Sequence, residues 1–371
     1  MTKIAKKLRT LIYNPQNAPL LIWRRLGSKS SYTFSSLLKA RALPPEAINF
    51  YPTDRCNLKC SMCFERLRKP NPEMEIEGWI KIIDQIKRFQ PRIHLSGGEP
   101  FVYPGIVDLI SYIKKSGLFL VITTNGTFLR EHAKEIIRMN VNRIHISIDG
   151  PKQIHDKIRG VKGTFDRIMT GLAKINKLKK HSRLPVIRIN SMLNFTNEPA
   201  MQEVIKIGYD IQAESIQFLH PLFIDSKSLA VHRLFLKKNL HHNLNYWQGA
   251  DIPCNTPEDF TKIQNLLENL QKERGIPVEI FPSFNPEQLK AYYNVDPYFY
   301  SIFHGKCRAM WETATILASG DVESCPDYIL GNCREKNFNI LWNNKKMKAL
   351  RRRIKNNQLF PVCRACCYFY K

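Results

Sequence analysis

The sequence predicts an α/β protein built on a parallel sheet, and two patterns support this. From Ala47 onward, short segments rich in β-branched residues alternate with segments whose apolar residues recur three and four positions apart. The alternation runs through six predicted strands, which is typical of parallel strands joined by crossover helices. Whether such a sheet stays open or curls into a full or partial barrel, its ligand site lies at the carboxyl ends of the strands.

Four regions can be distinguished along the chain. Residues 46–222 hold the repeat, and residues 305–371 are dense in cysteine, which predicts a second small domain. Residues 1–45 form a basic extension, and residues 223–304 form a predicted linker and cover without a chemical motif. The predicted strands cover residues 48–51, 92–96, 119–123, 143–148, 186–190 and 215–219. The predicted helices cover residues 77–89, 106–116, 130–139, 165–179 and 198–211.

The chain is strongly basic. It has 57 Lys and Arg residues against 32 Asp and Glu residues, which gives a formal net charge of +25. A field of that sign attracts anions, so nucleic acid, an anionic lipid and an anionic substrate all remain open beside a merely solvated surface. The sequence shows no nucleic-acid-binding motif with stacking aromatic residues that would favour the first of these.

Targeting signals are weak, and we expect a cytoplasmic protein. No apolar run reaches the roughly 18 residues that a membrane-spanning helix needs, and residues 1–10 lack the apolar stretch of a signal peptide. An apolar patch at residues 20–23 predicts a helix that packs on the main domain, with peripheral membrane contact as the alternative. In a reducing compartment, the ten cysteines indicate metal binding or catalysis.

Three cysteines follow the first predicted strand within one loop. They are Cys56, Cys60 and Cys63, separated by three and then two residues. Soft thiolate ligands at one point select an iron-sulfur cluster, zinc or copper(I). Zinc sites usually complete four protein ligands, whereas three thiolates suit a four-iron cluster that leaves one iron open to a small molecule. A zinc loop remains the alternative at this point.

With this spacing the sequence resembles the radical S-adenosylmethionine (radical SAM) superfamily. The resemblance implies a partial (β/α)6 TIM-like barrel and a [4Fe-4S] cluster whose open iron binds S-adenosylmethionine. It further implies reductive cleavage to a 5′-deoxyadenosyl radical, and a partner that supplies the electron, such as flavodoxin or ferredoxin. One departure is Met62, which stands before the last cysteine where the superfamily often has an aromatic residue beside adenine. Methionine is apolar and adaptable enough to pack there.

Later motifs extend the resemblance. The second predicted strand is followed by Gly97, Gly98, Glu99 and Pro100, similar to the GGEP motif that binds the amino end of S-adenosylmethionine. Glycines allow a sharp turn, and the glutamate supplies an acceptor for an ammonium group.

Three polar residues complete the cosubstrate site that the resemblance implies. Arg159 lies in a stretch similar to HDxxRG and has the two-pronged geometry that suits a carboxylate. Ser147 and Asn190 stand near the ends of the fourth and fifth predicted strands, and we expect them near the ribose. No residue is assigned as a catalytic acid, base or hydrogen donor.

A second set of cysteines lies near the end of the chain. Four thiolates from two separated segments can enclose either a four-iron cluster or a zinc ion. The spacing from Cys307 to Gly320 to Cys325 resembles the opening of the SPASM domain, and the few cysteines that follow resemble its shortened twitch form with one auxiliary [4Fe-4S] cluster. The predicted ligands are Cys307, Cys325, Cys363 and Cys366.

Three further cysteines stay outside this assignment. Cys367 could replace Cys366, and Cys333 stands where the resembled domain usually has an aliphatic residue. Cys254 is predicted to be a small buried side chain, with a role as hydrogen donor as the lesser alternative.

The function expected from these motifs is radical chemistry on a substrate that the sequence does not identify. A fully ligated auxiliary cluster would transfer electrons, which fits oxidation of a sugar or cyclitol and equally fits modification of a ribosomal peptide. A small molecule, glycan, lipid or peptide could be the substrate. A zinc protein that binds nucleic acid without radical chemistry is the first alternative. A methyl or sulfur transfer enzyme of the same superfamily is the second.

Overall fold

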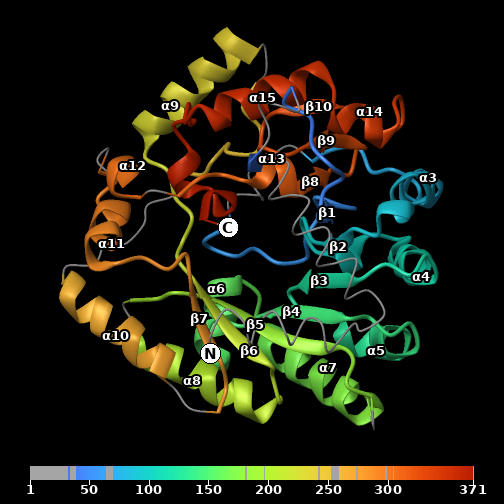
Figure 1. Cartoon of the computed structure of the whole chain (residues 1–371). Coiled ribbons are helices and arrows are strands. Elements are labelled where there is room, and N and C mark those ends of the chain that lie inside the picture. Colours follow the sequence, from blue (N-terminus) through green and yellow to red (C-terminus); the bar gives the residue numbers. More distant parts are fainter. Residues whose placement is uncertain are drawn as a thin grey trace.

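The structure is a computed structural model of the whole chain (Figure 1). It describes residues 32–33, 39–63, 70–179, 182–195, 197–240, 243–251, 259–272, 275–296, 299–303 and 305–370. The predicted apolar patch at residues 20–23 and Cys254 lie outside these ranges. Within them, none of the helices combines the length and the apolarity that crossing a bilayer requires.

One ten-stranded sheet organises the described residues, in the order β10-β9-β8-β1-β2-β3-β4-β5-β6-β7. All pairings from β8 through β1 to β7 are parallel, and β9 and β10 add antiparallel pairs at one edge. The strands are β1 Ala47–Phe50, β2 Arg92–Leu95, β3 Leu120–Thr124, β4 Arg143–Ser147, β5 Val186–Met192, β6 Ser215–Leu219, β7 Val278–Phe281, β8 Thr313–Ile316, β9 Asp321–Glu323 and β10 Ile329–Asn332.

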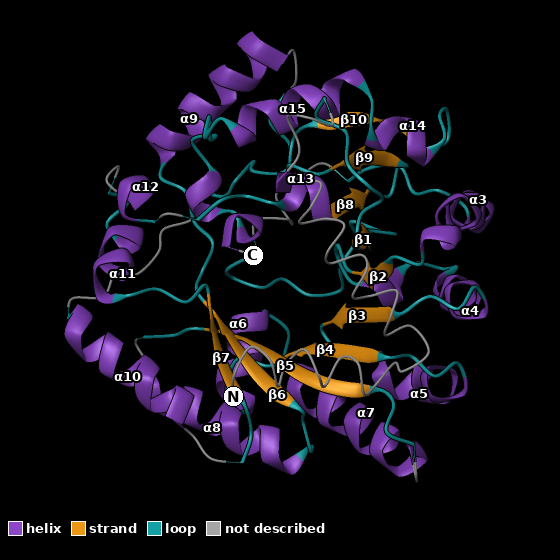
Figure 2. Cartoon of the chain, viewed as in Figure 1, coloured by secondary structure: helices purple, strands orange, loops and turns teal. Residues whose placement is uncertain are grey.

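Most of the helices lie on the outer side of this sheet (Figure 2). The helices that follow the first strands are α3 Ile76–Ile86, α4 Ile106–Lys115, α5 Leu129–Arg138, α6 Lys152–Arg159, α7 Thr164–Lys179 and α8 Glu198–Asp210. The later ones are α9 Ser226–Phe235, α10 Phe260–Lys272, α11 Pro286–Tyr293, α12 Phe299–Ile302, α13 Ala309–Glu312, α14 Phe338–Trp342 and α15 Lys345–Lys355. Short turns complete the chain at Lys87–Phe89, Pro100–Val102, Leu236–Leu240, Cys363–Ala365 and Cys367–Tyr370.

Alternation along the strands separates an outer from an inner face. In β4, Ile144 and Ile146 are fully buried at 0% exposure, whereas Arg143, His145 and Ser147 between them are half-buried. Successive side chains of a strand point to opposite faces, so the isoleucines face the helices and the polar residues face inward. This apolar burial against the helices holds the layers together.

The predicted α/β fold is confirmed, and the ends of its elements shift little. All six predicted strands and all five predicted helices are present, although β5 extends two residues beyond its predicted end, to Met192. Helix α6 was not predicted, because it has only eight residues and two of them, Ile154 and Ile158, are apolar.

The sheet also includes strands from outside the repeat. Strand β7 comes from the predicted linker and cover, residues 223–304, and pairs in parallel with β6. Strand β8 comes from the predicted cysteine-rich domain and pairs in parallel with β1. With four residues each, neither strand gives a strong sequence signal. The domain limits stay a prediction, but the sheet includes strands from three of the four predicted regions.

A buried arginine joins the segment before β1 to the C-terminal helices. Arg351 in α15 is 0% exposed and donates to the backbone carbonyls of Ala40, Met310 and Trp342 at 2.9 to 3.1 Å, and to Asn343 Oδ1 at 2.7 Å. Burial lowers its pKa to about 9. Its hydrogen bonds therefore secure the segment before β1 against the C-terminal helices.

We predict that Arg351→Ala lowers the free energy of unfolding by about 3 kcal/mol, because it leaves buried carbonyl groups without donors. The neighbouring Arg352→Ala is the control, since that residue is exposed on the same helix. Thermal or denaturant unfolding measures both variants. Equal, small losses in the two would show that Arg351 does not hold these segments together.

Candidate functional site

The loop after β1 carries the first three cysteines and is held by backbone contacts on two sides. On one side, Gly98 N donates to Thr53 O at 3.0 Å and Glu99 N donates to Arg55 O at 2.9 Å. On the other side, Lys59 N donates to Arg159 O at 3.1 Å, and Ser61 N donates to Ile158 O at 2.9 Å. The GGEP segment and the end of α6 therefore clamp the cysteine loop between them.

Two glycines are required for this clamp. A Cβ atom on Gly98 would lie 2.2 Å from Arg55 O, and one on Gly160 would lie 2.5 Å from Lys59 O. Gly160 also has a φ of 70°, a left-handed conformation that favours glycine, and it ends α6. Any side chain at either position would push the loop away, so these glycines serve the packing of the cysteine loop itself.

The three thiols gather at this clamp. Cys60 is buried, Cys63 is half-buried and Cys56 is an exposed residue. The pKa of Cys56 is raised to about 11, mainly by partial burial of its thiol and to a smaller extent by the nearby Glu99, Cys60 and Cys63. Among the described residues, no three His, Cys, Asp or Glu side chains converge closely enough to hold a single metal ion. A four-iron cluster takes one thiolate per ligated iron, so the donor set of three thiols in one loop fits such a cluster with one iron left open.

Glu99 is fixed inside the protein beside this loop. It is 1% exposed, and its carboxylate accepts from Thr124 Oγ1 at 2.7 Å, Asn125 N at 2.7 Å and Phe101 N at 3.2 Å. Burial raises its pKa to about 7, against the opposing effect of these hydrogen bonds and of Arg159. Glu99 thus ties the GGEP segment to the end of β3, while its predicted contact with the cosubstrate stays a prediction.

Arg159 lies between the cysteine loop and an acid that the sequence reasoning did not assign. Its Nη2 is 2.6 Å from Asp149 Oδ2, and its Nη1 donates to Cys60 Sγ at 3.8 Å. Asp149 Oδ1 accepts from Met192 N at 2.9 Å, and Asp149 N donates to His155 Nδ1 at 3.2 Å. The only sequence signal for Asp149 was its place just after β4, at the ligand edge of the sheet.

The remaining predicted cosubstrate residues lie around the same edge. Ser147 and Asn190 are register partners on β4 and β5, and Asn190 Oδ1 accepts from Arg188 Nε at 3.1 Å. Pro100 is buried at the start of a short turn, and Met62 is half-buried next to Cys63. The structure therefore brings the cysteine loop, the GGEP segment and Arg159 into direct contact, and places the ribose candidates on neighbouring strands.

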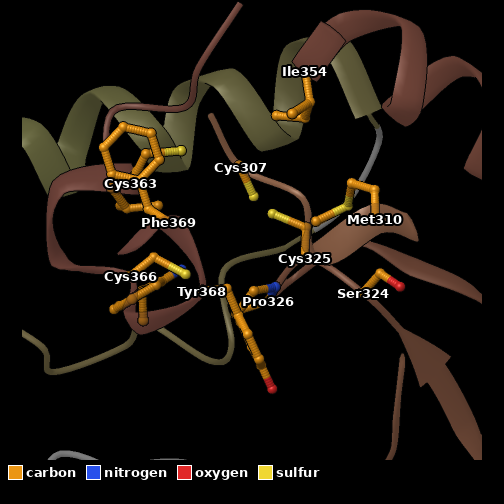
Figure 3. A pocket seen from close by; sticks show the side chains of 12 residues that line it. Cys307, Met310, Ser324, Cys325, Pro326, Ile354, Cys363, Cys366, Tyr368 and Phe369 are labelled. Carbon is orange, nitrogen blue, oxygen red and sulfur yellow. The ribbon is translucent and has the colours of Figure 1, made fainter. Parts of the chain in front are cut away.

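The second set of cysteines lines one pocket (Figure 3). Cys307 and Cys325 lie across from Cys363 and Cys366. Burial raises the pKa of Cys307 to about 11 and that of Cys363 to about 12. The other pocket residues are mostly apolar: Trp247, Met310, Ser324, Pro326, Ile354, Val362, Tyr368 and Phe369. Four thiols in an apolar enclosure fit a fully ligated iron-sulfur cluster, whose binding would displace their protons.

The neighbouring cysteines differ from these four. Neither Cys367 nor Cys333 is among the residues that line the pocket. Cys333 is buried near Gly320, to whose carbonyl its N donates at 2.8 Å. Within the pocket, Phe360 N donates to Cys363 Sγ at 3.2 Å. This placement favours Cys366 over Cys367 as the fourth ligand.

Tyr368 joins this pocket to the sheet. Its ring lines the pocket, and its hydroxyl accepts from Asn49 Nδ2 at 2.6 Å and lies 3.4 Å from Thr315 Oγ1. Asn49 belongs to β1 and Thr315 to β8, and Asn49 Nδ2 also donates to Thr315 Oγ1 at 3.1 Å. One side chain therefore spans from the four cysteines to the inner face of the barrel sheet.

Comparison with known families agrees with this geometry. Residues 50–202 match the family described as the radical SAM superfamily, and residues 307–367 match SPASM, an iron-sulfur cluster-binding domain. The chain belongs to the radical SAM superfamily. The predicted family, the [4Fe-4S] cluster with S-adenosylmethionine, and the presence of auxiliary iron-sulfur in the SPASM domain are thereby confirmed, while the individual ligands and the count of one auxiliary cluster remain predictions.

Curated relatives of this radical SAM protein carry out several chemistries. It is 25% identical to the tungsten-containing aldehyde ferredoxin oxidoreductase cofactor-modifying protein of Pyrococcus furiosus, over 85% of each chain. It is 24% identical to the AdoMet-dependent heme synthase of Methanosarcina barkeri, over 82% of this chain and 83% of that one. Fe-coproporphyrin III synthase of the same organism is 35% identical, but the match spans only 40% of this chain and 38% of that relative.

Solved structures share the fold at low identity. SuiB of Streptococcus suis bound to S-adenosylmethionine has a TM-score of 0.62 at 16% identity, covering 87% of this chain and 72% of SuiB. The structure of anSMEcpe with bound AdoMet has a TM-score of 0.57 at 19% identity, covering 82% of this chain and 79% of that one. These likenesses show a common fold for the radical SAM core and its C-terminal extension.

We predict that the reconstituted protein holds about eight irons in two four-iron clusters. Cys366→Ala removes a thiolate from the auxiliary pocket, so its iron content falls to about half. Cys367→Ala is the matched control and keeps the full content. Iron and sulfide analysis of anaerobically reconstituted protein measures both. Loss of iron in the Cys367 variant with full content in the Cys366 variant would reverse the assignment.

Proposed function

We propose that this protein cleaves S-adenosylmethionine reductively and uses the 5′-deoxyadenosyl radical to take a hydrogen atom from a substrate. The observation that carries the proposal is the three-cysteine loop, clamped between the GGEP segment and the end of α6 in a radical SAM protein. When bound there, a four-iron cluster with one open iron supplies the chelating metal and the electron for this cleavage. The electron would come from a reductant such as flavodoxin or ferredoxin.

Different residues of the chain would bind the cluster and the carboxylate of S-adenosylmethionine. Cys56, Cys60 and Cys63 supply three thiolates and leave no fourth cysteine in the loop, which fits a cluster with an open position. Arg159 presents a guanidinium beside Cys60 and is held by Asp149, so it is oriented before a ligand arrives. In this proposal it binds the carboxylate of S-adenosylmethionine, and Asp149 is its positioning residue.

The GGEP segment would receive the amino end of the cosubstrate. Glu99 already accepts from Phe101, Thr124 and Asn125, which fixes the segment in place. Ser147 and Asn190, side by side on neighbouring strands, would bind the ribose, and Met62 would pack beside adenine. These assignments follow the residues' positions at the carboxyl edge of the sheet.

The second cysteine pocket supports an oxidative outcome. Four thiols from two segments would complete the ligation of an auxiliary cluster, so we propose that it transfers electrons and does not bind substrate. Oxidation of a sugar or cyclitol and modification of a ribosomal peptide both use such an acceptor. The structure of SuiB has been solved with its precursor peptide SuiA, and other relatives are heme synthases. The proposed substrates therefore include both small molecules and peptides.

The zinc alternative has less support. Both matching domains belong to iron-sulfur families, and the matched residues include all seven proposed cysteine ligands. The basic charge of the chain agrees equally with an anionic substrate and with nucleic acid.

We predict that the anaerobically reconstituted protein forms 5′-deoxyadenosine from S-adenosylmethionine in the presence of a strong reductant. Cys60→Ala removes one of three cluster ligands and lowers this rate at least 100-fold, because the cluster is lost or displaced. Cys333→Ala removes a buried cysteine outside both proposed sites and serves as the control. Chromatography of the quenched reaction measures the product. Wild-type rates in the Cys60 variant would contradict the proposed function.

A further inference from the structure

Polar side chains form a row across the inner face of the parallel sheet. They come from seven consecutive strands, β1 to β7, and most of them sit at positions that alternate with buried apolar residues. The row consists of Asn49, His94, Thr123, His145, Arg188, Asn190, Gln217 and Glu279. None of these residues belongs to the two cysteine sites, and only Asn190 was assigned to the cosubstrate.

The register of the strands makes the centre of this row continuous. His145 on β4 is the register partner of Thr123 on β3 and of Arg188 on β5. The ring centroids of His94 and His145 are 5.8 Å apart, and His94 Nε2 lies 2.7 Å from Thr123 Oγ1. Two imidazoles and a guanidinium are therefore neighbours on adjoining strands.

Arg188 is half-buried, and its partners are neutral. Its Nε donates to Asn190 Oδ1 at 3.1 Å, and its Nη2 donates to Gln217 Oε1. Among the described residues, no carboxylate lies within ion-pair distance of Arg188. By contrast, Arg143 at the start of β4 forms an ion pair with Glu214 at 2.8 Å. Burial lowers the pKa of Arg188 to about 10, so its charge is retained at neutral pH.

Gln217 separates this charge from the nearest acid of the row. Its amide oxygen accepts from Arg188, and its Nε2 donates to Glu279 Oε2 at 3.4 Å. The amide therefore lies between the two charges, and the carboxylate of Glu279 acts on Arg188 without a direct ion pair. Arg188 Nη1 makes no hydrogen bond to any part of the chain that the structure describes, in contrast to Arg351, whose three guanidinium nitrogens all donate.

His145, on the strand next to Arg188, has a ring nitrogen that makes no hydrogen bond. Its Nε2 atom is buried and has no hydrogen-bond partner. Burial lowers its pKa well below the usual value, and Arg188, His94, Arg143 and Arg92 lower it further. On adjoining strands, a buried imidazole nitrogen without a partner and a guanidinium without a direct ion pair can together hold one anion.

We propose that the inner face of the sheet binds an anionic group of the substrate, a carboxylate or a phosphate, through Arg188 and His145. Both anions match the charge and the planar donor geometry of a guanidinium. The inference rests on the proposed function, since it takes the substrate to enter the inner face of the barrel beside the cosubstrate. It narrows the substrate class to molecules that carry such a group.

The test is an anion titration of the reconstituted protein with S-adenosylmethionine bound, so that the cosubstrate occupies its own carboxylate site. Sodium phosphate and sodium acetate are the two probes, with sodium chloride at equal ionic strength as the reference. The midpoint of thermal unfolding is followed under anaerobic conditions. The variants are Arg188→Gln, Arg188→Lys and His145→Gln, and the charge-matched control is Arg167→Gln, which changes an exposed arginine on α7.

We expect a saturable rise of the midpoint with at least one probe in the wild type and in Arg167→Gln. The apparent affinity for the anion falls at least tenfold in Arg188→Gln. It falls less in Arg188→Lys, which keeps the positive charge but loses the two-pronged guanidinium. Saturation by acetate alone indicates a substrate carboxylate, and saturation by phosphate alone indicates a phosphate. If Arg188→Gln fails to fold, His145→Gln decides, with an expected loss of at least threefold.

Two results would overturn the inference. One is a wild type that shows no saturable response to either probe, and the other is an unchanged response in both Arg188→Gln and His145→Gln. Because the titration does not measure 5′-deoxyadenosine, its failure in a protein that still cleaves S-adenosylmethionine affects the inference alone. Intact anion binding in a protein that cannot cleave S-adenosylmethionine would affect the proposed function alone.

Discussion

The close backbone packing around the cysteine loop is the constraint on which the rest of the candidate site depends. The loop holds its three thiols together only because the GGEP segment and the end of α6 approach its backbone without side chains at Gly98 and Gly160. Each flank also donates or accepts backbone hydrogen bonds with the loop. The same contact brings Arg159 to Cys60, so the position of the proposed carboxylate ligand and that of the thiols are set together.

Direct contacts also link the C-terminal region to the barrel. Strand β8 continues the sheet beside β1, and the buried Arg351 fixes the segment before β1 to the last helices. Tyr368 reaches from the auxiliary cysteine pocket to Asn49 on the inner face of β1. The two cysteine sites are therefore attached to one continuous sheet, which would give a cluster in the second site a fixed position relative to the barrel. In such an arrangement, the distance between the two cysteine sites is set by the packing of the sheet and helices and does not depend on a flexible linker.

Much of this could be predicted from local sequence, and the rest required the tertiary structure. The six strands and five helices have clear periodicities, and the cysteine and GGEP motifs follow strands as a parallel sheet demands. Helix α6 and strand β7 are too short to give a clear sequence signal, because they have eight and four residues. Asp149 could be paired with Arg159 only once α6 had folded back over the end of β4. The polar row around Arg188 depends on strand register, since each strand contributes only one or two of its members.

If the clamped loop leaves one iron open to S-adenosylmethionine, electron-nuclear double resonance will detect the cosubstrate on that iron. The reduced protein would be measured with S-adenosylmethionine that carries ¹⁷O in its carboxylate and ¹⁵N in its amino group. We expect hyperfine coupling of both labels to the reduced cluster, and loss of this coupling when Cys60 is replaced by alanine. A spectrum that does not change with either label would contradict it, because the iron would then have no cosubstrate bound to it.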